Sequence, residues 1–197
     1  MSDDRSVIVH SKRRVFDRFF KIDEADVTFS KIAGAGFIRA KLLVFERGDS
    51  AAALLHDVER DCVILTEQFR FPTYDKGPGW LTEPIAGSIE PEETPEHCIR
   101  REILEEIGYE AGELEAIGRF YVSPGGTSER VFLFYAPVTQ RNLKHAKASG
   151  LLQQHENIQR IEVKTAEFIA AALSGRYEDA KLLIAAYWLA LKLHNCA

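Results

Sequence analysis

The hydrophobic and polar positions of residues 6–46 indicate β-strands. Val27 and Phe29 lie among polar residues, and a second, more apolar stretch covers residues 37–45. Between them, the run Ala-Gly-Ala-Gly at residues 33–36 is typical of a hairpin turn. The pattern predicts a small antiparallel sheet whose core is too small to stand alone.

Beyond this region, short apolar strands alternate with turns and helices. Strands are expected at residues 51–55, 63–65, 81–86, 114–122, 131–138 and 158–163. Loops are expected at residues 71–80, 123–130 and 140–156, where proline, glycine and polar residues gather. Two C-terminal helices, at about 166–174 and 179–194, each carry one apolar face. Strands interleaved with helices predict a layered α/β fold.

The same pattern suggests how the chain of 197 residues is organised. We expect residues 1–47 to form an N-terminal β-sheet region and residues 48–197 to form the main domain. Because the N-terminal sheet is marginal by itself, we expect it to bury its apolar face on a second copy of the chain.

Composition narrows the classes of partner. A net charge of −5 and a pI near 5.7 argue against a nucleic-acid binder with a basic surface. The longest apolar run, at 182–191, is too short to span a bilayer, and no signal peptide is visible. Cys62, Cys98 and Cys196 show no paired spacing and are typical of reduced thiols. We therefore expect a cytoplasmic protein without a membrane or nucleic-acid partner.

The most informative chemistry is a row of acids at Glu102, Glu105 and Glu106. On a helix, the i, i+3, i+4 spacing places these carboxylates along one side, where like charges repel by about 0.2–0.5 kcal/mol per pair. A hard cation such as Mg²⁺ or Mn²⁺ would neutralise them and leave room for phosphate. The alternative is a solvated, acid-rich surface helix.

Signals on both sides of this row define the helix. Thr94 can cap it, Pro95 fits its first turn, and Gly108 can adopt the left-handed conformation that ends it. An apolar stripe would face the core, made of Cys98, Ile99, Ile103 and Ile107. The helix is thus held on one side, and two of its acids lie at the negative end of its dipole, a conflict that favours a functional role.

The spacing of this segment resembles the Nudix box, G-x5-E-x7-R-E-U-x-E-E-x-G-U, in which U is a bulky aliphatic residue. The matching residues are Gly87, Glu93, Arg101, Glu102, Ile103, Glu105, Glu106 and Gly108. Tyr109 occupies the last position, which affects packing more than chemistry. The resemblance implies the Nudix fold, a mixed β-sheet sandwiched between helices, with the N-terminal antiparallel β-sheet as an appendage.

The resemblance also implies roles for the box. Two or more Mg²⁺ ions, or Mn²⁺, would be held by side chains and by one backbone carbonyl, namely Glu102, Glu105, Glu106 and the carbonyl of Ala86. An ion pair between Glu93 and Arg101 would hold the loop to the helix. The implied reaction is attack of water on a phosphorus of a pyrophosphate.

A general base is also required. In the ADP-ribose branch of the family, a later loop supplies one carboxylate as a metal ligand and one as the base. Glu156 matches the metal-ligand position, whereas Gln154 occupies the position of the base and cannot take a proton at neutral pH. The base is therefore expected to be Glu156, with His155 and Glu105 as alternatives.

The run Ser-Pro-Gly-Gly-Thr-Ser-Glu at residues 123–129 resembles that of ADP-ribose pyrophosphatases, with Pro124 fifteen residues after the box. Substrate contacts are expected from this run and from three residues matched elsewhere, namely Pro124, Gly125, Glu129, Arg70, Glu83 and Phe19. By resemblance, Arg70 would bind phosphates, Glu83 would lie near the ribose and Phe19 would stack on adenine across a dimer. A solvated Arg70 and a core-packed Phe19 are the alternatives.

Together these features predict a metal-dependent hydrolase of ADP-ribose or a related nucleoside diphosphate sugar, with AMP and ribose 5-phosphate as products from ADP-ribose. If the chain is an enzyme with another substrate, we expect a GDP-mannose-type pyrophosphatase. If it is not an enzyme, we expect a non-catalytic nucleotide sensor, although the intact box disfavours this alternative. We expect a homodimer with an exchanged N-terminal sheet.

Overall fold

The fold is taken from a computed structural model that describes residues 5–144 and 158–195. The chain divides into two compact units. The smaller unit comprises the chain up to Gly48 together with Tyr121–Arg130, and the larger comprises Asp49–Phe120 and the chain from Val131 onwards. The division into an N-terminal sheet region, residues 1–47, and a main domain, residues 48–197, stays a prediction.

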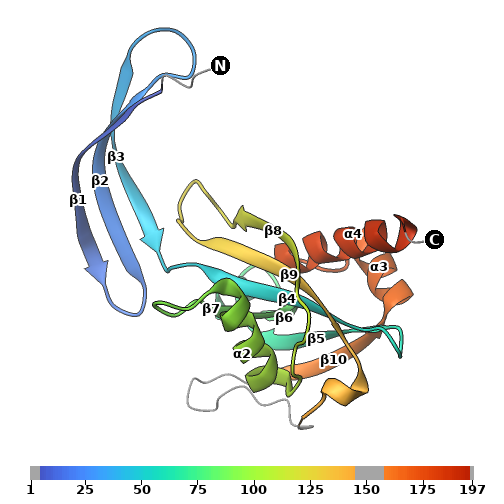
Figure 1. Ribbon diagram of the computed structural model, residues 1–197. Coiled ribbons are helices and arrows are strands. Elements are labelled where there is room, and N and C mark those ends of the chain that lie inside the picture. Colours follow the sequence, from blue (N-terminus) through green and yellow to red (C-terminus); the bar gives the residue numbers. More distant parts are fainter. Residues whose placement is uncertain (1–4, 145–157, 196–197) are drawn as a thin grey trace. The chain divides into compact units, whose positions relative to one another are not determined.

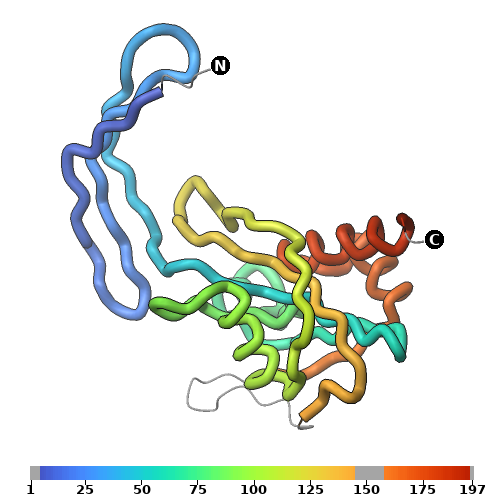
Figure 2. The backbone as a smooth tube through the Cα atoms, viewed as in Figure 1, coloured from blue at the N-terminus to red at the C-terminus, as the bar shows by residue number. Residues whose placement is uncertain are grey.

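The smaller unit contains a three-stranded antiparallel sheet (Figures 1 and 2). Its strands are β1 (Val7–Asp17), β2 (Lys21–Ser30) and β3 (Phe37–Glu46), in that order across the sheet. The turn between β2 and β3 contains Gly34 and Gly36 at positive φ, as the glycine run predicted. All of β1 is exposed, and Val27 is the buried apolar residue of β2. The sheet is therefore present as expected, with little core of its own.

A seven-stranded mixed sheet forms the centre of the fold. Its strands are β4 (Ser50–Asp57), β5 (Cys62–Phe69), β6 (Trp80–Glu83), β7 (Ile85–Ser88), β8 (Glu115–Tyr121), β9 (Arg130–Val138) and β10 (Gln159–Lys164). The main order is β10-β5-β4-β9-β8, with β6 paired to β5 and β7 paired to β4. The β4–β9 pair is parallel, whereas β4–β5 and β5–β10 are antiparallel.

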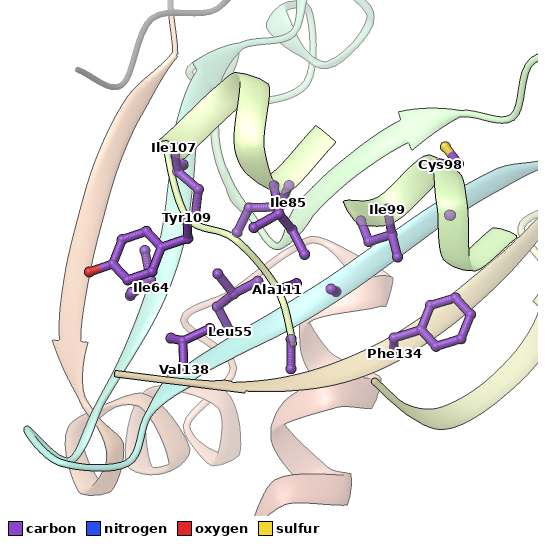
Figure 3. Close-up of a cluster of buried hydrophobic side chains, with 14 residues drawn as sticks. Leu55, Ile64, Ile85, Cys98, Ile99, Ile107, Tyr109, Ala111, Phe134 and Val138 are labelled. Carbon is purple, nitrogen blue, oxygen red and sulfur yellow. The ribbon is translucent and has the colours of Figure 1, made fainter. Parts of the chain in front are cut away.

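Helices cover both faces of the larger unit's sheet (Figure 1). Alternate residues of β4 show the two layers: Ala53 and Leu55 pack with α2 (Pro95–Ile107), whereas Leu54 packs with α3 (Thr165–Leu173) and α4 (Ala180–Asn195). Figure 3 shows the cluster beneath α2. Successive side chains of β4 thus point to opposite faces of the sheet and belong to two separate hydrophobic cores. This arrangement confirms the predicted fold class.

The structure differs from the sequence expectation in residues 71–80. Instead of a continuous loop, the segment begins with a short helix, α1 (Phe71–Tyr74), and its last residue, Trp80, opens β6 opposite Phe69. Pro72 suits the first turn of α1. The strand expected at residues 81–86 is present but divided in two, because β6 pairs with β5 and β7 pairs with β4. A further short 3₁₀ helix, η1, covers Gln140–Asn142.

Tyr109, the departure from the box pattern, is fully buried in the core under α2. Its hydroxyl accepts a 3.0 Å hydrogen bond from Gln140 Nε2, which also donates to Asp57 Oδ2 at 3.1 Å. A buried polar group with a partner avoids the cost of desolvation. Tyrosine therefore replaces an aliphatic residue here without disrupting the packing. Among the described helices, none has the length and apolar content needed to cross a bilayer.

Candidate active site

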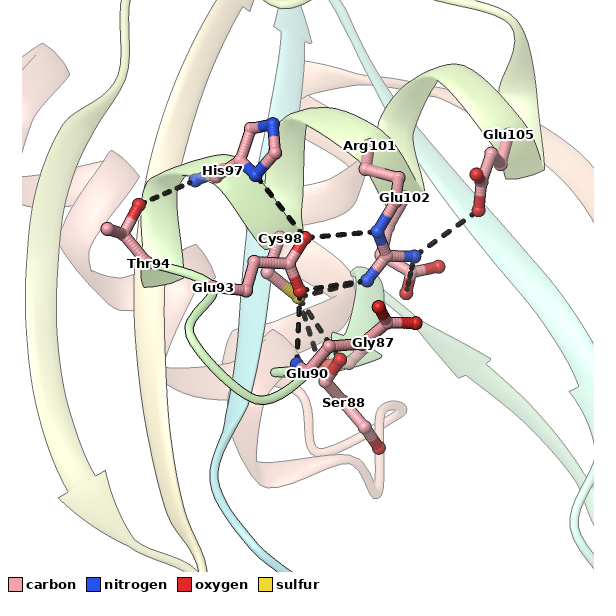
Figure 4. Close-up of polar contacts among 10 residues, drawn as sticks. All are labelled: Gly87, Ser88, Glu90, Glu93, Thr94, His97, Cys98, Arg101, Glu102 and Glu105. Carbon is pink, nitrogen blue, oxygen red and sulfur yellow. Dashed lines mark hydrogen bonds and ion pairs between the residues drawn. The ribbon is translucent and has the colours of Figure 1, made fainter.

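The helix that carries the box, α2, begins and ends as its sequence predicts. Thr94 Oγ1 accepts a hydrogen bond from His97 N at 3.2 Å, and Pro95 occupies the first turn (Figure 4). At the other end, Gly108 adopts φ +76°, and its N–H donates to Leu104 O. Both ends satisfy backbone groups that would otherwise lack partners. The helix is therefore a defined platform for its side chains.

The three acids of α2 differ in exposure. The stripe of Cys98, Ile99, Ile103 and Ile107 is buried, as predicted. Glu106 is also buried, at 6% exposure, whereas the Glu102 and Glu105 side chains are 16% and 44% exposed. A solvated surface helix would not bury a carboxylate of this kind, because desolvating a charge is costly. The burial of Glu106 argues against that alternative.

Arg101 joins the loop before α2 to the acid row (Figure 4). Its Nε and Nη2 each lie 3.1 Å from a carboxylate oxygen of Glu93, which confirms the predicted ion pair. Its Nη1 lies 2.8 Å from Glu102 Oε1 and 3.3 Å from Glu105 Oε2. The hydrogen bonds from Arg101 lower the pKa of Glu93 to about 2. One guanidinium thus orients two of the three acids.

Gly87 brings the backbone of β7 directly against Glu102. A Cβ at residue 87 would lie 2.0 Å from Glu102 Oε1 and 2.3 Å from its Cγ. No side chain larger than hydrogen fits there while Glu102 keeps its position. The box glycine therefore sets the place of this carboxylate beside the strand that contains Ala86.

The predicted metal ligands can be tested for chemical fit. Carboxylate oxygens on α2 and the carbonyl of the adjoining β7 are the hard donors that Mg²⁺ and Mn²⁺ prefer. Within residues 5–144 and 158–195, no three Asp, Glu, His or Cys side chains are already grouped to hold a metal ion. Glu156 lies outside the described residues, as do Gln154 and His155. The donor types fit a divalent cation, and the identity of the base stays a prediction.

Arg70 and Glu83, two predicted substrate residues, contact each other in the larger unit. Arg70 Nε lies 2.7 Å from Glu83 Oε2, and Lys181 Nζ of α4 lies 3.2 Å from Glu83 Oε1. Lys181 also lies 2.6 Å from Asp179 Oδ2. Burial acts to lower the pKa of Lys181, but the carboxylates of Asp179 and Glu83 outweigh it and raise the pKa. Arg70 is thus anchored by a buried carboxylate rather than simply solvated.

Sequence reasoning missed Lys181 and Asp179. Lys181 lies in the first turn of α4, where a cation opposes the helix dipole. That electrostatic conflict is the same kind of signal that identified the acids of α2, and it could have marked Lys181 as well.

The remaining predicted substrate residues lie in the smaller unit. The turn at 123–130 is held by hydrogen bonds from Gly126 N and Thr127 N to Ser123 O, and by one from Phe45 N to Gly126 O. Glu129 is 8% exposed and lies 3.4 Å from Arg47 Nε. A pocket of about 410 Å³ opens between β3 and this turn, with Leu42, Leu43, Tyr121, Pro124, Gly125 and Thr127 in its lining.

Phe19, also in the smaller unit, is 91% exposed, and its ring meets that of Phe20 edge-on at 4.8 Å. The alternative that Phe19 packs in the core of its own chain is therefore wrong. An exposed aromatic ring remains available for contact with a ligand or a second chain.

The fold and the box helix together define an α/β protein with a carboxylate-lined helix beside a glycine-backed strand. Residues 46–183 match the model of the NUDIX domain. The chain belongs to the NUDIX domain family, which confirms the family inferred from the box residues.

Three relatives share sequence across most of their length. A GDP-mannose pyrophosphatase of Pectobacterium atrosepticum is 38% identical over 156 residues, 78% of this chain and 79% of the relative. A GDP-mannose pyrophosphatase of Citrobacter koseri is 36% identical, over 75% of this chain and 76% of the relative. One of Escherichia coli is 32% identical, over 85% of this chain and 86% of the relative. A crystal structure of an ADP compounds hydrolase has a TM-score of 0.73 at 16% identity, covering 97% of this chain and 96% of that one. The latter likeness shows the fold alone.

Proposed function

We propose that this protein hydrolyses the pyrophosphate bond of a nucleoside diphosphate sugar, giving a nucleoside monophosphate and a sugar phosphate. The observation that carries the proposal is the assembled box, in which Arg101 and Gly87 position the acids of α2. Sequence analysis placed ADP-ribose first. The relatives named GDP-mannose pyrophosphatase favour the alternative, so GDP-mannose is the first compound to test.

The cofactor in this proposal is Mg²⁺, with Mn²⁺ as a substitute, and two or more ions per site. The ligands would be the Ala86 carbonyl and the carboxylates of Glu102, Glu105, Glu106 and Glu156. When bound, the ions supply positive charge that stabilises attacking hydroxide and leaving phosphate. Arg101 and Glu93 hold the carboxylates in place, and removing either would loosen the site without removing its charge.

The remaining roles concern the proton and the substrate. Glu156 is proposed as the base, and Glu105, at 44% exposure, is accessible enough to be the alternative in α2. Arg70 is proposed to bind phosphate oxygens while Glu83 holds its guanidinium from behind. Pro124, Gly125, Glu129 and Phe19 are proposed to contact the nucleoside.

The proposal extends to assembly and location. We place the dimer contact in the N-terminal region, residues 1–47, because β1 exposes Val7, Ile8 and Val9 at 54–67%. Residues 48–197 would be the catalytic domain. Cys62 and Cys98 are free thiols, which is consistent with a cytoplasmic protein. The absence of nucleic-acid and membrane partners stays a prediction.

The test is a panel of nucleoside diphosphate sugars, including GDP-mannose and ADP-ribose, incubated with Mg²⁺ and scored for phosphomonoester release. Glu106→Gln is the control, because it removes one charge from a buried position and should abolish most turnover while the fold survives. Chelation by EDTA should stop the reaction. If no diphosphate compound is cleaved although one binds, the protein is a nucleotide sensor and the hydrolase proposal is wrong.

A further inference from the structure

Arg160 of β10 lies in a row of side chains that crosses three strands. Arg160 is paired with Thr66 of β5, and Thr66 is paired with Glu83 of β6. Residues directly opposite each other in an antiparallel pair place their side chains on the same face. Arg160, Thr66 and Glu83 therefore share one face of the sheet.

The neighbouring row identifies that face. Two residues along β5, Ile64 is paired with Glu162 on one side and with Leu55 on the other. Ile64 and Leu55 belong to the core beneath α2. Since side chains of a strand return to the same face every two residues, the row of Arg160 lies on the α2 face as well. This is the face covered by the helix that carries the box acids.

Arg160 carries a buried donor that its surroundings do not satisfy. Its guanidinium lies 5.9 Å from the ring centroid of Tyr109, the residue that follows the end of α2 at Gly108. Its Nε is 3.8 Å from Glu162 Oε1, beyond hydrogen-bond distance. Its Nη1 is buried, and within the described residues it has no hydrogen-bond partner. Buried N–H groups without partners are rare and call for an explanation.

The carboxylate of this row is already engaged. Glu83 binds Arg70 through one oxygen and Lys181 through the other. The Nη1 of Arg160 thus remains a charged donor without a hydrogen-bond partner among the described residues. A guanidinium N–H of this kind is suited to an anion with several oxygens.

We propose that Arg160 is a substrate-binding residue whose Nη1 donates to a phosphate oxygen of the diphosphate, on the same sheet face as Thr66 and Glu83. This inference rests on the proposed function for the identity of the ligand. Arg70, which follows β5 and is anchored by Glu83, and Arg160 of β10, beside the ring of Tyr109, would then both contact the diphosphate. No motif of the sequence marks Arg160, because its role follows from strand register.

The test compares Arg160→Met and Arg160→Lys with the unaltered chain, using ADP and inorganic pyrophosphate as binding probes in calorimetry. Arg119→Met is the matched control, since Arg119 also lies 5.9 Å from a ring, that of Phe132, but is exposed on β8. We expect Arg160→Met to weaken ADP binding about tenfold or more, the loss of one charge-assisted hydrogen bond. Arg160→Lys should recover part of it, and Arg119→Met should change nothing.

The outcomes separate this inference from the proposed function. If nucleotide sugars are cleaved but Arg160→Met keeps the affinity for ADP and the KM of the unaltered chain, the inference is wrong and the function stands. If the chain binds ADP through Arg160 but cleaves nothing, the function is wrong and the inference stands. If the unaltered chain binds neither ADP nor pyrophosphate, the inference is wrong, and the function is decided by the cleavage assay alone. A melting temperature near that of the unaltered chain would show that Arg160→Met is folded. If Arg160→Met does not fold, the affinity of Arg160→Lys for ADP is compared with that of the unaltered chain instead.

Discussion

At the scale of single residues, the site depends on close contacts around Glu102. Gly87→Ala would place a methyl group where the Glu102 side chain lies, so the carboxylate must move. We expect kcat/KM to fall about 10- to 100-fold, the usual range for disturbed support of a metal ligand, with the fold intact. Steady-state kinetics and a melting curve measure both. Gly118→Ala is the control because a Cβ there meets open space; equal activity of the two variants would contradict the expectation.

The Glu93–Arg101 ion pair gives a second prediction, for pH. Hydrogen bonds from Arg101 lower the pKa of Glu93 from 4.5 to about 2. Because the folded pKa lies below the unfolded value, the pair stabilises the fold above about pH 4.5, and this stabilisation is lost as pH falls toward 2. Melting temperatures measured from about pH 6 to about pH 2.5 should fall less steeply for Glu93→Gln than for the unaltered chain. If the melting temperatures of the two proteins fall equally with pH, Glu93 does not contribute to the pH dependence of stability.

The sequence predicted these contacts unequally. The resemblance to the Nudix box implies the pairing of Glu93 with Arg101, because both residues occupy fixed positions of that motif. The contacts of Lys181, Gln140 and Arg160 were not predicted, since each meets its partners only after separate strands and helices have been brought together. Glu156 illustrates another limit, because its match to a loop position says nothing of where its carboxylate lies.

At the scale of elements, α2 offers a test of local design. Thr94→Ala removes the side-chain oxygen that accepts from His97 N. The loss of such a cap costs about 1 kcal/mol, and we expect this decrease in the free energy of unfolding from denaturant titration. Thr94→Ser keeps a hydroxyl and should retain most of the stability. If serine and alanine destabilise equally, the hydroxyl is not the source of the effect.

The helices and most strands could be predicted because caps and apolar periodicity are local signals. Two details could not: the short helix α1 within the loop expected at 71–80, and the division of the strand expected at 81–86 into β6, which pairs with β5 from Trp80 onwards, and β7, which pairs with β4. Trp80 and Phe69 pair at that point and their rings lie 5.4 Å apart. Tertiary pairing here outweighs local composition.

At the scale of the whole molecule, β1 is the feature that requires a partner under our proposal. Its apolar side chains are exposed along an edge strand, which invites association. We expect the unaltered chain to sediment as a dimer and a Val7→Glu/Val9→Glu variant to sediment as a monomer with reduced activity. Leu173→Glu, which alters an equally exposed apolar residue of α3, should remain dimeric. A monomeric unaltered chain would contradict the assembly proposed here.

The parallel pairing of β4 with β9 has a consequence for how the chain acquires its fold. β4 is buried along its whole length, yet its partner on one side comes only after α2 and β8 have been made. Contacts between such distant segments close long loops, which slows folding. During synthesis, β4 would therefore lack one of its partner strands until β9, which ends at Val138, has left the ribosome. The growing chain is thus most prone to aggregation during synthesis of the segment that contains α2.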